Sequence, residues 1–334
     1  MAKKNYSNEP YIFKTFQAFA IAYFATYILG NILLKIGELV HMETLVEWGN
    51  HVSVLLGPAI GIAIAYKSGV GLLGLISSMI AGAMIMPTSV VNHQVALPLI
   101  TYLTVIIVVL CIRMVENKTP LDLFLIPLLA LLISGVIKIW ISPYVISMIS
   151  YIISFINELT VSNEIVMGML IALISGLIYC TPITLVAITS LLSFNLLASG
   201  AMLAGAMSFI IGLGLMSLQD NDIGDSLAVM IGTPVLQFSN LVKHPLLLIP
   251  PIISSLVCGV LSVCVFKIPC SLIGASQGGT ALIGLLEATN IMGMQYWIIV
   301  VLSDLIIPIV INFSIYQLFR KARYIKNGDL KILK

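Results

Sequence analysis

Long apolar runs, separated by short polar stretches, repeat along almost the whole chain. An α-helix needs about 20 mostly apolar residues to cross the roughly 30 Å hydrocarbon core of a bilayer. The runs that meet or approach this length are 11–34, 52–66, 69–86, 97–113, 121–141, 165–188, 196–216, 245–267 and 294–318. The stretch 142–164 reads either as an interfacial helix or as a further short span. The pattern predicts an all-α polytopic membrane protein with about ten transmembrane helices.

Two further apolar pieces, 226–242 and 270–287, are short for a membrane crossing and are interrupted in the middle. The first is broken by Gly232-Thr233-Pro234, and the second by the glycine-rich run from Gly274 to Gly279. Inside a membrane, broken backbone persists only where it is packed in protein or lines a wet cavity. Interrupted short segments of this kind are typical of transporter binding sites. We therefore expect two re-entrant hairpins, packed against the spans 196–216, 245–267 and 294–318.

The composition supports a membrane protein. Of the 334 residues, 60% are hydrophobic and 9% are charged, and the mean hydropathy is +1.11. A soluble chain of this length has no way to bury so much apolar surface. The five cysteines lie in apolar stretches without a CxxC pair, which is typical of buried, inert thiols. We therefore expect no metal and no cofactor. No basic stretch interleaved with aromatic residues indicates binding to nucleic acid.

The distribution of charge predicts the orientation of the chain. Lys3, Lys4 and Lys14 accompany the first span, and a basic segment, 320–334, follows the last one. Cytoplasmic loops of membrane proteins are enriched in Lys and Arg, so we expect both termini to be cytoplasmic. The loop 35–51 carries three glutamates and is expected outside. The basic segment also suits contact with the headgroups of anionic membrane lipids.

The stretches 232–261 and 273–286 resemble a known family. A Gly-x-Pro turn, an Asn, a Pro and an Ile-Pro pair that opens an apolar run occur in the order Gly232, Pro234, Asn240, Pro245, Ile249 and Pro250. This order is similar to that of the membrane IIC component of the bacterial sugar phosphotransferase system. The second stretch, IGASQGGTALIGLL, resembles the shorter IIC-like family that includes the perfringolysin-regulator type of membrane protein.

The resemblance implies an elevator-type transporter in a bacterial cell membrane. Residues 1–164 would form a scaffold and homodimer interface, and residues 165–334 would move with the substrate held between the hairpins. The substrate would be a sugar or polyol, and separate IIA and IIB phosphocarrier proteins would be partners. Sugar-phosphorylating members use a Glu ahead of the Gly-x-Pro turn and a His in another hairpin. Here the nearest acid, Asp225, lies seven residues before Gly232, and no GxHG-like motif is found. Whether the chain takes part in phosphotransfer therefore stays open.

Three acids, Asp220, Asp222 and Asp225, lie within six positions directly ahead of the first interrupted segment. Carboxylates accept several hydrogen bonds and suit sugar hydroxyls, and hard cations prefer oxygen ligands. We expect Asp222 and Asp225 to bind substrate, and Asp220 is a candidate for ion or proton coupling. The alternative is a solvated loop in which Asp225 caps a helix that begins at Ser226.

Both interrupted segments carry polar residues at the expected depth of the membrane. A buried polar group without a partner costs about 2–7 kcal/mol, so each must bond to backbone, water or substrate. The candidates for substrate binding are Thr233, Gln237 and Asn240 in the first segment and Ser276, Gln277 and Thr280 in the second. The glycines of the second segment allow a ligand to approach the backbone closely. The alternatives are that these side chains satisfy the broken backbone itself, or that the glycines serve close helix packing.

His244 and Asp304 are further candidates for proton or ion coupling. A His changes charge near neutral pH, and a carboxylate inside a membrane span usually has a function or a partner. The alternatives are a polar cap at the membrane edge for His244 and a structural pair for Asp304. The sequence thus leaves three functions open. They are a IIC-type sugar transporter, an ion- or proton-coupled carrier without phosphorylation, and a membrane sensor that controls gene expression through a separate partner.

Overall fold

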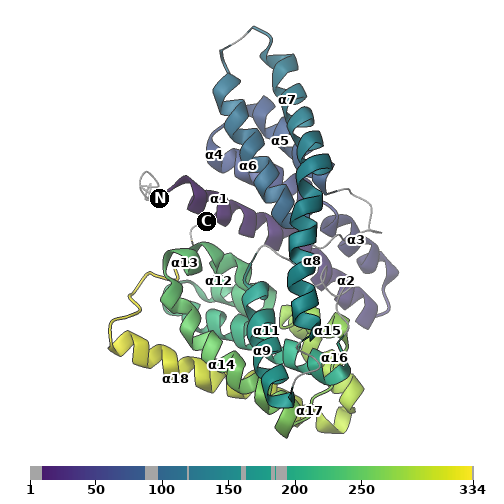
Figure 1. The fold of residues 1–334 in the computed structure, drawn as a ribbon, viewed down its shortest axis with the longest axis vertical. Helices are drawn as coiled ribbons and strands as arrows, with labels where there is room; N and C mark the ends of the chain where they lie inside the picture. The colour runs from purple at the N-terminus through teal and green to yellow at the C-terminus, as the bar shows by residue number, and fades with distance from the viewer. Residues whose placement is uncertain are drawn as a thin grey trace.

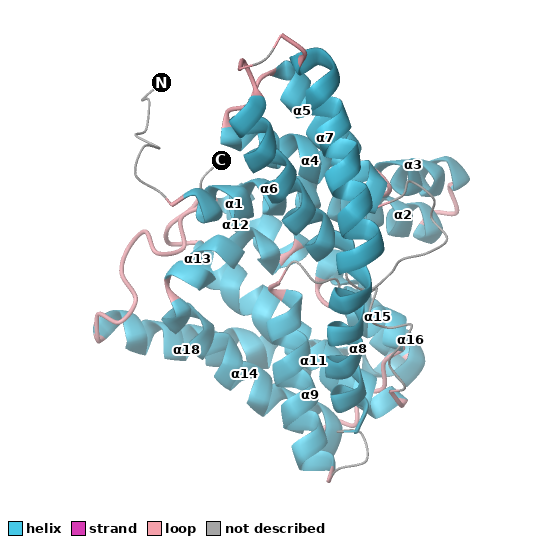
Figure 2. Ribbon diagram, turned by 45° about the horizontal axis from the view of Figure 1, so that its top comes forward, coloured by secondary structure: helices cyan, strands magenta, loops and turns pink. Residues whose placement is uncertain are grey.

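The computed structural model describes residues 10–86, 97–118, 120–158, 163–181, 185 and 194–332. All regular secondary structure in these residues is helical, and no strand occurs among them (Figure 2). The all-α class is thereby confirmed. It follows from the apolar runs, because a segment surrounded by lipid must satisfy its backbone hydrogen bonds internally, and an α-helix does so.

The described part of the chain before residue 160 consists of eight α-helices and two π-helical turns. They are α1 (Tyr11–Tyr23), η1 (Phe24–Ile28), α2 (Leu29–Leu39), α3 (Glu43–Ser53), α4 (Leu56–Ser68), α5 (Leu72–Ile85), α6 (Leu97–Val115), α7 (Asp122–Val136), η2 (Ile137–Ile141) and α8 (Ser142–Glu158). Figure 1 shows α4 to α7 grouped at the upper end of the molecule, with α1 below them. The turn η2 joins α7 to α8, which reaches down beside the second part of the chain (Figure 1).

Four helices form the centre of the second part: α9 (Glu164–Tyr179), α11 (Leu196–Ser217), α14 (Ile249–Val260) and α18 (Ile307–Lys321). Helix α11 packs against the other three, and nearly all of its side chains are buried. A helix that is apolar on all sides belongs in the interior. Helices α9 and α14 approach closely at Gly168 and Gly259, where a Cβ on Gly168 would lie 2.7 Å from the Gly259 carbonyl oxygen. Small residues at this crossing allow the backbones to meet.

The two short apolar segments are broken helices. The first broken element consists of α12 (Ile223–Leu227), η5 (Ala228–Gly232), η6 (Pro234–Gln237) and α13 (Phe238–Lys243). The second broken element consists of α15 (Leu272–Gln277), η9 (Thr280–Leu282) and α16 (Ile283–Met292). The remaining elements are η7 (Pro245–Leu248), η8 (Leu261–Val265), η10 (Met294–Tyr296), α17 (Trp297–Val301) and η11 (Leu302–Ile306).

Six helical stretches in the described residues are long and apolar enough to cross a membrane, and a seventh is obtained if α3 and α4, bent by 46°, count as one span. Four shorter apolar helices accompany them: Leu72–Ile85, Glu164–Tyr179, Ile223–Gly232 and Thr280–Met292. The total of about ten spans stays a prediction, and the expected span 165–188 lies partly outside the described residues. The stretch 35–51, expected as a loop outside the membrane, is mostly helical and forms the end of α2 and most of α3, and its side of the membrane stays a prediction. Its glutamates are compatible with a helix that has one polar face.

Candidate functional site

The two broken elements meet at their breaks. The Thr280 hydroxyl, at the start of η9, donates a hydrogen bond to the carbonyl oxygen of Gly232, at the end of η5 (2.9 Å). The last carbonyl groups of a helix have no partner within it. Thr280 therefore satisfies a group that the first break leaves open, and this bond joins two segments that are 48 positions apart in the sequence.

The break in the first element follows from its local sequence. Thr233 has an extended backbone (φ −158°, ψ 137°) between η5 and η6. A residue before proline is disfavoured in the helical region, and Pro234 has no N–H to donate. The Thr233 hydroxyl accepts a hydrogen bond from the Val235 N–H (3.3 Å) and so caps η6. The sequence Gly-Thr-Pro thus ends one helical piece and begins the next.

The break in the second element has a rarer backbone conformation. Gly278 has φ +53° and ψ −127°, and Ala281 and Leu282 have positive φ values of 47° and 60°. Such conformations cost of order 1–3 kcal/mol each when a side chain is present. A Cβ on Gly278 would lie 2.8 Å from the Ala206 Cβ on α11. Close packing against α11 therefore holds this turn in place, and turns of this kind are frequent at binding sites.

Tyr179, the last residue of α9, connects the second break to the rest of the site. Its hydroxyl donates to the Gln277 carbonyl oxygen (2.7 Å) and lies 2.7 Å from the Thr280 hydroxyl oxygen. Together with the bond from Thr280 to Gly232, the two hydroxyls make three contacts. Each hydroxyl has one proton to donate. Only two of the three contacts are therefore hydrogen bonds at any one time.

A small cavity lies at this junction. Its volume is about 20 Å³, and a single water molecule requires roughly 10–15 Å³. Hydroxyl, phenol and amide groups line it together with a few apolar side chains: Tyr23, Tyr27, Ile28, Tyr179, Thr181, Leu185, Thr233, Val235, Ser276, Gln277 and Thr280. Residues of both breaks line the cavity, and polar and apolar groups share its walls. A molecule as large as a sugar fits only when these walls separate.

The comparison with protein families shows what kind of protein holds this cavity. A family model described as "Phosphotransferase system, EIIC" matches residues 13–332, which include both broken elements. The chain belongs to the phosphotransferase system EIIC family. This finding confirms the resemblance seen in the sequence, and together with the apolar helices it identifies a multi-pass membrane transporter of the EIIC type. EIIC proteins in general have a sugar substrate and separate IIA and IIB partners. A search of curated proteins and a search of solved structures each found no match.

Four of the residues predicted to bind substrate line the cavity of this EIIC protein: Thr233, Ser276, Gln277 and Thr280. All four are buried. The Ser276 hydroxyl donates to the Ile273 carbonyl oxygen of its own helix (2.7 Å), so part of its bonding capacity serves the backbone. Polar residues of both breaks thus converge on one place, as substrate binding between the segments requires.

Three other predicted residues contact the chain segment that follows α18. The Asp220 carboxylate accepts hydrogen bonds from the N–H groups of Gly328 (2.9 Å) and Leu330 (3.1 Å). The Gln237 amide donates to the Leu330 carbonyl oxygen (2.9 Å) and accepts from the Asn240 amide (2.7 Å). None of the three lines the cavity at the breaks. In this conformation their polar groups serve the contact with that segment.

Asp222 and Asp225 lie at the start of α12. Asp222 occupies the N-cap position, and the helix begins at Ile223, three residues before Ser226. Asp225 falls in the first turn, where the helix dipole favours a negative charge. The alternative in which Asp225 is the cap is therefore wrong. Neither aspartate lines the cavity at the breaks, and their role in substrate binding stays a prediction.

The tyrosines of the cavity are a feature that the sequence analysis missed. Tyr23 and Tyr27 lie on α1 and η1, both are buried, and their ring centroids are 5.2 Å apart. Within a long apolar run they read as ordinary members of a span. Their spacing of four residues places them on one helix face, and buried tyrosine hydroxyls usually have a polar partner. This combination is the signal that would have pointed to them.

Asp304 and His244 lie in different surroundings. Asp304 is fully buried in η11, where the Ser303 hydroxyl donates to its Oδ1 atom (3.1 Å). Within the described residues, its Oδ2 atom has no hydrogen-bond partner and no basic side chain pairs with it. The π-helical geometry of η11 is frequent at functional sites. The Nε2 atom of His244, by contrast, is 3.8 Å from a carboxylate oxygen of Asp329.

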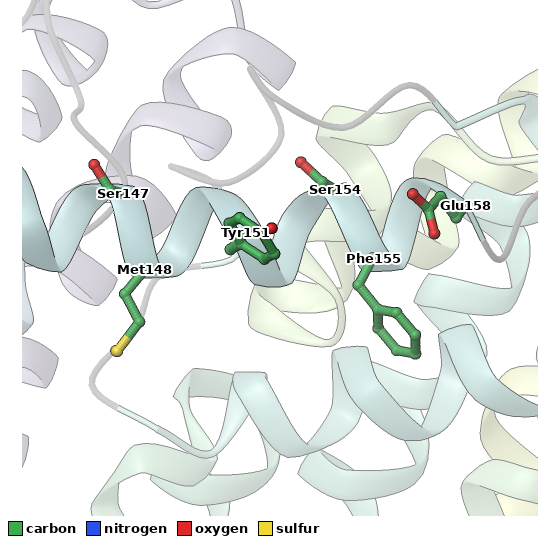
Figure 3. A pocket seen from close by; sticks show the side chains of 6 residues that line it. All are labelled: Ser147, Met148, Tyr151, Ser154, Phe155 and Glu158. Atoms are coloured by element: carbon green, nitrogen blue, oxygen red, sulfur yellow. The ribbon is translucent and has the colours of Figure 1, made fainter.

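A wide hollow of about 970 Å³ lies along α8, and it contains none of the predicted site residues. The described residues that line it all lie on this helix: Ser147, Met148, Tyr151, Ser154, Phe155 and Glu158. Figure 3 shows Met148 and Phe155 on one side of the helix and Ser147 and Ser154 on the other. An apolar helix face of a membrane protein meets lipid or another polypeptide, so this hollow is a surface feature rather than a second substrate cavity.

Proposed function

We propose that this EIIC protein binds a sugar or polyol in the cavity where the two broken elements meet and carries it across the membrane. The observation that supports this most is the hydrogen bond from Thr280 to Gly232, because it brings both interrupted segments to one cavity. Hydroxyl and amide groups supply the donors and acceptors that sugar hydroxyls require. Broken helices whose ends face a substrate are common in transporters.

The mechanism we propose is a rigid-body, elevator-type movement of residues 165–334 relative to residues 1–164. The cavity of about 20 Å³ must widen before a sugar enters. Tyr23 and Tyr27 line it from the first of these parts, whereas Tyr179 and both breaks line it from the second. Relative movement of the parts therefore separates the walls. The buried helix α11, packed on α9, α14 and α18, supports movement of the second part as one body.

The proposal includes a homodimer with its interface on the first part of the chain. Large apolar side chains on α7 and α8 support it, since Phe124, Tyr144 and Tyr151 are 76%, 77% and 85% exposed. Such faces are covered by membrane lipid or by a second copy. We also propose cytoplasmic termini, and a separate phosphorylated IIB protein as the source of any phosphoryl group.

The first test compares Thr280→Val with Thr289→Val. Both residues are buried, but the Thr289 hydroxyl donates to the Leu285 carbonyl oxygen of its own helix (2.7 Å). Binding of a panel of labelled sugars and polyols is measured on the purified protein in liposomes. We expect Thr280→Val to weaken binding about ten-fold, because an unpaired buried polar group costs about 1–3 kcal/mol. Thr289→Val should leave binding nearly unchanged, and an equal loss in both variants contradicts the proposal.

Uptake into the same liposomes then separates the modes of transport. Accumulation that needs an added phosphorylated IIB protein supports phosphotransfer-linked transport. Binding of a sugar without any flux, with and without the IIB protein and ion gradients, contradicts transport and favours the sensor alternative.

Asp304 favours one second candidate, an ion- or proton-coupled carrier without phosphorylation. Its buried Oδ2 atom, which has no hydrogen-bond partner in the described part of the chain, is a place where a proton or small cation would be stabilised. The test is uptake driven by a pH or sodium gradient. We expect Asp304→Asn to abolish gradient-driven accumulation while sugar binding persists. This candidate is contradicted if uptake by the unmodified protein is the same with and without a pH or sodium gradient.

A further inference from the structure

The chain segment after α18 is bound through its backbone by side chains around the first broken element. Leu330 shows this most completely, because its N–H donates to the Asp220 carboxylate (3.1 Å). Its carbonyl oxygen accepts from the amides of Asn221 and Gln237 (2.7 and 2.9 Å). The Asn221 amide oxygen also accepts from the Ile332 N–H (2.7 Å). Asn221 therefore bonds to this segment much as a neighbouring strand would.

Apolar contacts anchor the same segment. Leu330 and Ile325 are buried and belong to a cluster with side chains of α11 and of the first broken element: Leu213, Met216, Val229 and Leu241. A segment that buries two apolar side chains and satisfies its backbone groups has a defined position on the protein.

The segment also closes the junction between α1 and the first broken element. Lys331 and Ile332 line a gap of about 10 Å³ there, together with Gln17, Ala20, Ile21, Leu236, Ser239 and Asn240. The Asn240 amide donates to the Lys331 carbonyl oxygen (3.1 Å). Figure 1 shows the chain rising from α18 to the C-terminus beside α1 and α13. This junction lies between the part that we propose to be the scaffold and the part that we propose to move.

The contacts lie on both sides of the first break. Asp220 and Asn221 precede α12, whereas Gln237 and Asn240 follow Thr233. A segment that is bonded to residues before and after the break limits how far the helical pieces before Thr233 (α12 and η5) can separate from those after it (η6 and α13). Thr233, at the break between them, lines the cavity.

We propose that residues 326–332 form a strap that locks the first broken element closed, and that the cavity widens only after the strap has released its partners. The lock is a property of the fold alone, whereas its effect on transport rests on the proposed function. A strap of this kind shifts the population between closed and open states according to whether it is bound.

The test is hydrogen–deuterium exchange of the full chain in lipid nanodiscs, which needs no substrate. Asn221→Ala removes the amide that binds both Leu330 and Ile332, together with its bonds to Ser217 on α11. Asp222→Ala is the matched control, since none of the hydrogen bonds between this loop and the described strap residues involves Asp222. We expect Asn221→Ala to speed exchange of the strap amides about ten-fold, together with faster exchange at 228–240. Exchange at α16 should not change, and Asp222→Ala should leave all three regions as they are.

A second variant, Leu330→Ser, changes a strap residue, keeps every side chain of the helices, and removes the apolar anchor of the strap on Leu213, Met216, Val229 and Leu241. It should reproduce the faster exchange at 326–332 and at 228–240. The proposal is overturned if the strap of the unmodified protein exchanges as fast as an unstructured peptide. It is also overturned if the strap is freed while exchange at 228–240 stays the same.

Uptake measurements test whether the strap affects transport. Once a transported sugar is found, Leu330→Ser should raise the initial uptake rate about three-fold, because the closed state loses its lock. A lower rate with a freed strap would show that the segment supports the site rather than restrains it, and would overturn the proposal. Absence of uptake by the unmodified protein contradicts the proposed function instead. The exchange experiment still tests whether the strap locks the first broken element.

Discussion

The two broken elements reach one cavity by different means. In the first, Thr233 becomes extended because Pro234 follows it, and no residue from 228 to 243 has a positive φ. In the second, Gly278, Ala281 and Leu282 all have positive φ. The first break is thus a product of local sequence with little backbone strain, whereas the second is imposed by its surroundings.

Their surroundings differ as well. The second break packs directly on α11 and Tyr179 in the protein interior. The first also packs on α11, where Met230 lies against Gly214 and the Gln237 amide donates to the Ser217 hydroxyl, and it is bonded in addition to the strap. Dense packing allows little adjustment, whereas hydrogen bonds to an end segment exchange readily with water. The comparison indicates that the bonds to the strap are the part of the first element's surroundings that is able to release without unpacking the protein interior.

Gly278→Ala should have the largest effect. The variant places a Cβ at φ +53° and 2.8 Å from the Ala206 Cβ, and strain plus overpacking should cost about 3 kcal/mol. We expect a clearly lower Tm in detergent. Gly224→Ala is the control, because an added Cβ there meets nothing within 4 Å. If both variants melt alike, the second break is not held by its packing.

Tyr179→Phe should have an intermediate effect. It keeps the ring and removes the hydroxyl that donates to the Gln277 carbonyl oxygen. The loss of a buried partner should lower the free energy of unfolding by about 1–2 kcal/mol. Tyr144→Phe, on the exposed face of α8, should leave the Tm unchanged. A Tyr179→Phe variant with the Tm of the unmodified protein would show that the hydroxyl does not stabilise the second break.

Pro234→Ala should have the smallest effect. Proline at this position mainly restricts the unfolded chain, so its loss should cost about 0.5–1 kcal/mol. Pro245→Ala, at the start of η7 and away from the cavity, should cost a similar amount. The loss of stability in each of the two variants is measured from its Tm in detergent. A loss for Pro234→Ala as large as that for Gly278→Ala would mean that tertiary packing also imposes the first break, and the contrast between the two elements would disappear.

Local chemistry explains what the sequence predicted. Apolar runs of membrane length require helices, Gly-Thr-Pro interrupts the first short segment by its own backbone chemistry, and the glycines from Gly274 to Gly279 permit the positive-φ turn that packing imposes on the second. Polar residues beside such breaks need partners, so Thr233, Ser276, Gln277 and Thr280 were identifiable, and all four line the cavity. The family resemblance rests on the same local motifs, and the family match confirms it.

Only the tertiary structure decided which polar groups meet. Asp220, Gln237 and Asn240 look like ligands in the sequence, but they bind backbone groups more than 90 positions away. Tyr23, Tyr27 and Tyr179 lie within apolar runs of the sequence and look like ordinary span residues there, yet they line the cavity. A hydrogen bond satisfies a donor regardless of how far along the chain its acceptor lies. Glycine and proline in the sequence mark where a helix is able to break, while the packing of α11, α1 and the strap determines which partners the exposed polar groups meet.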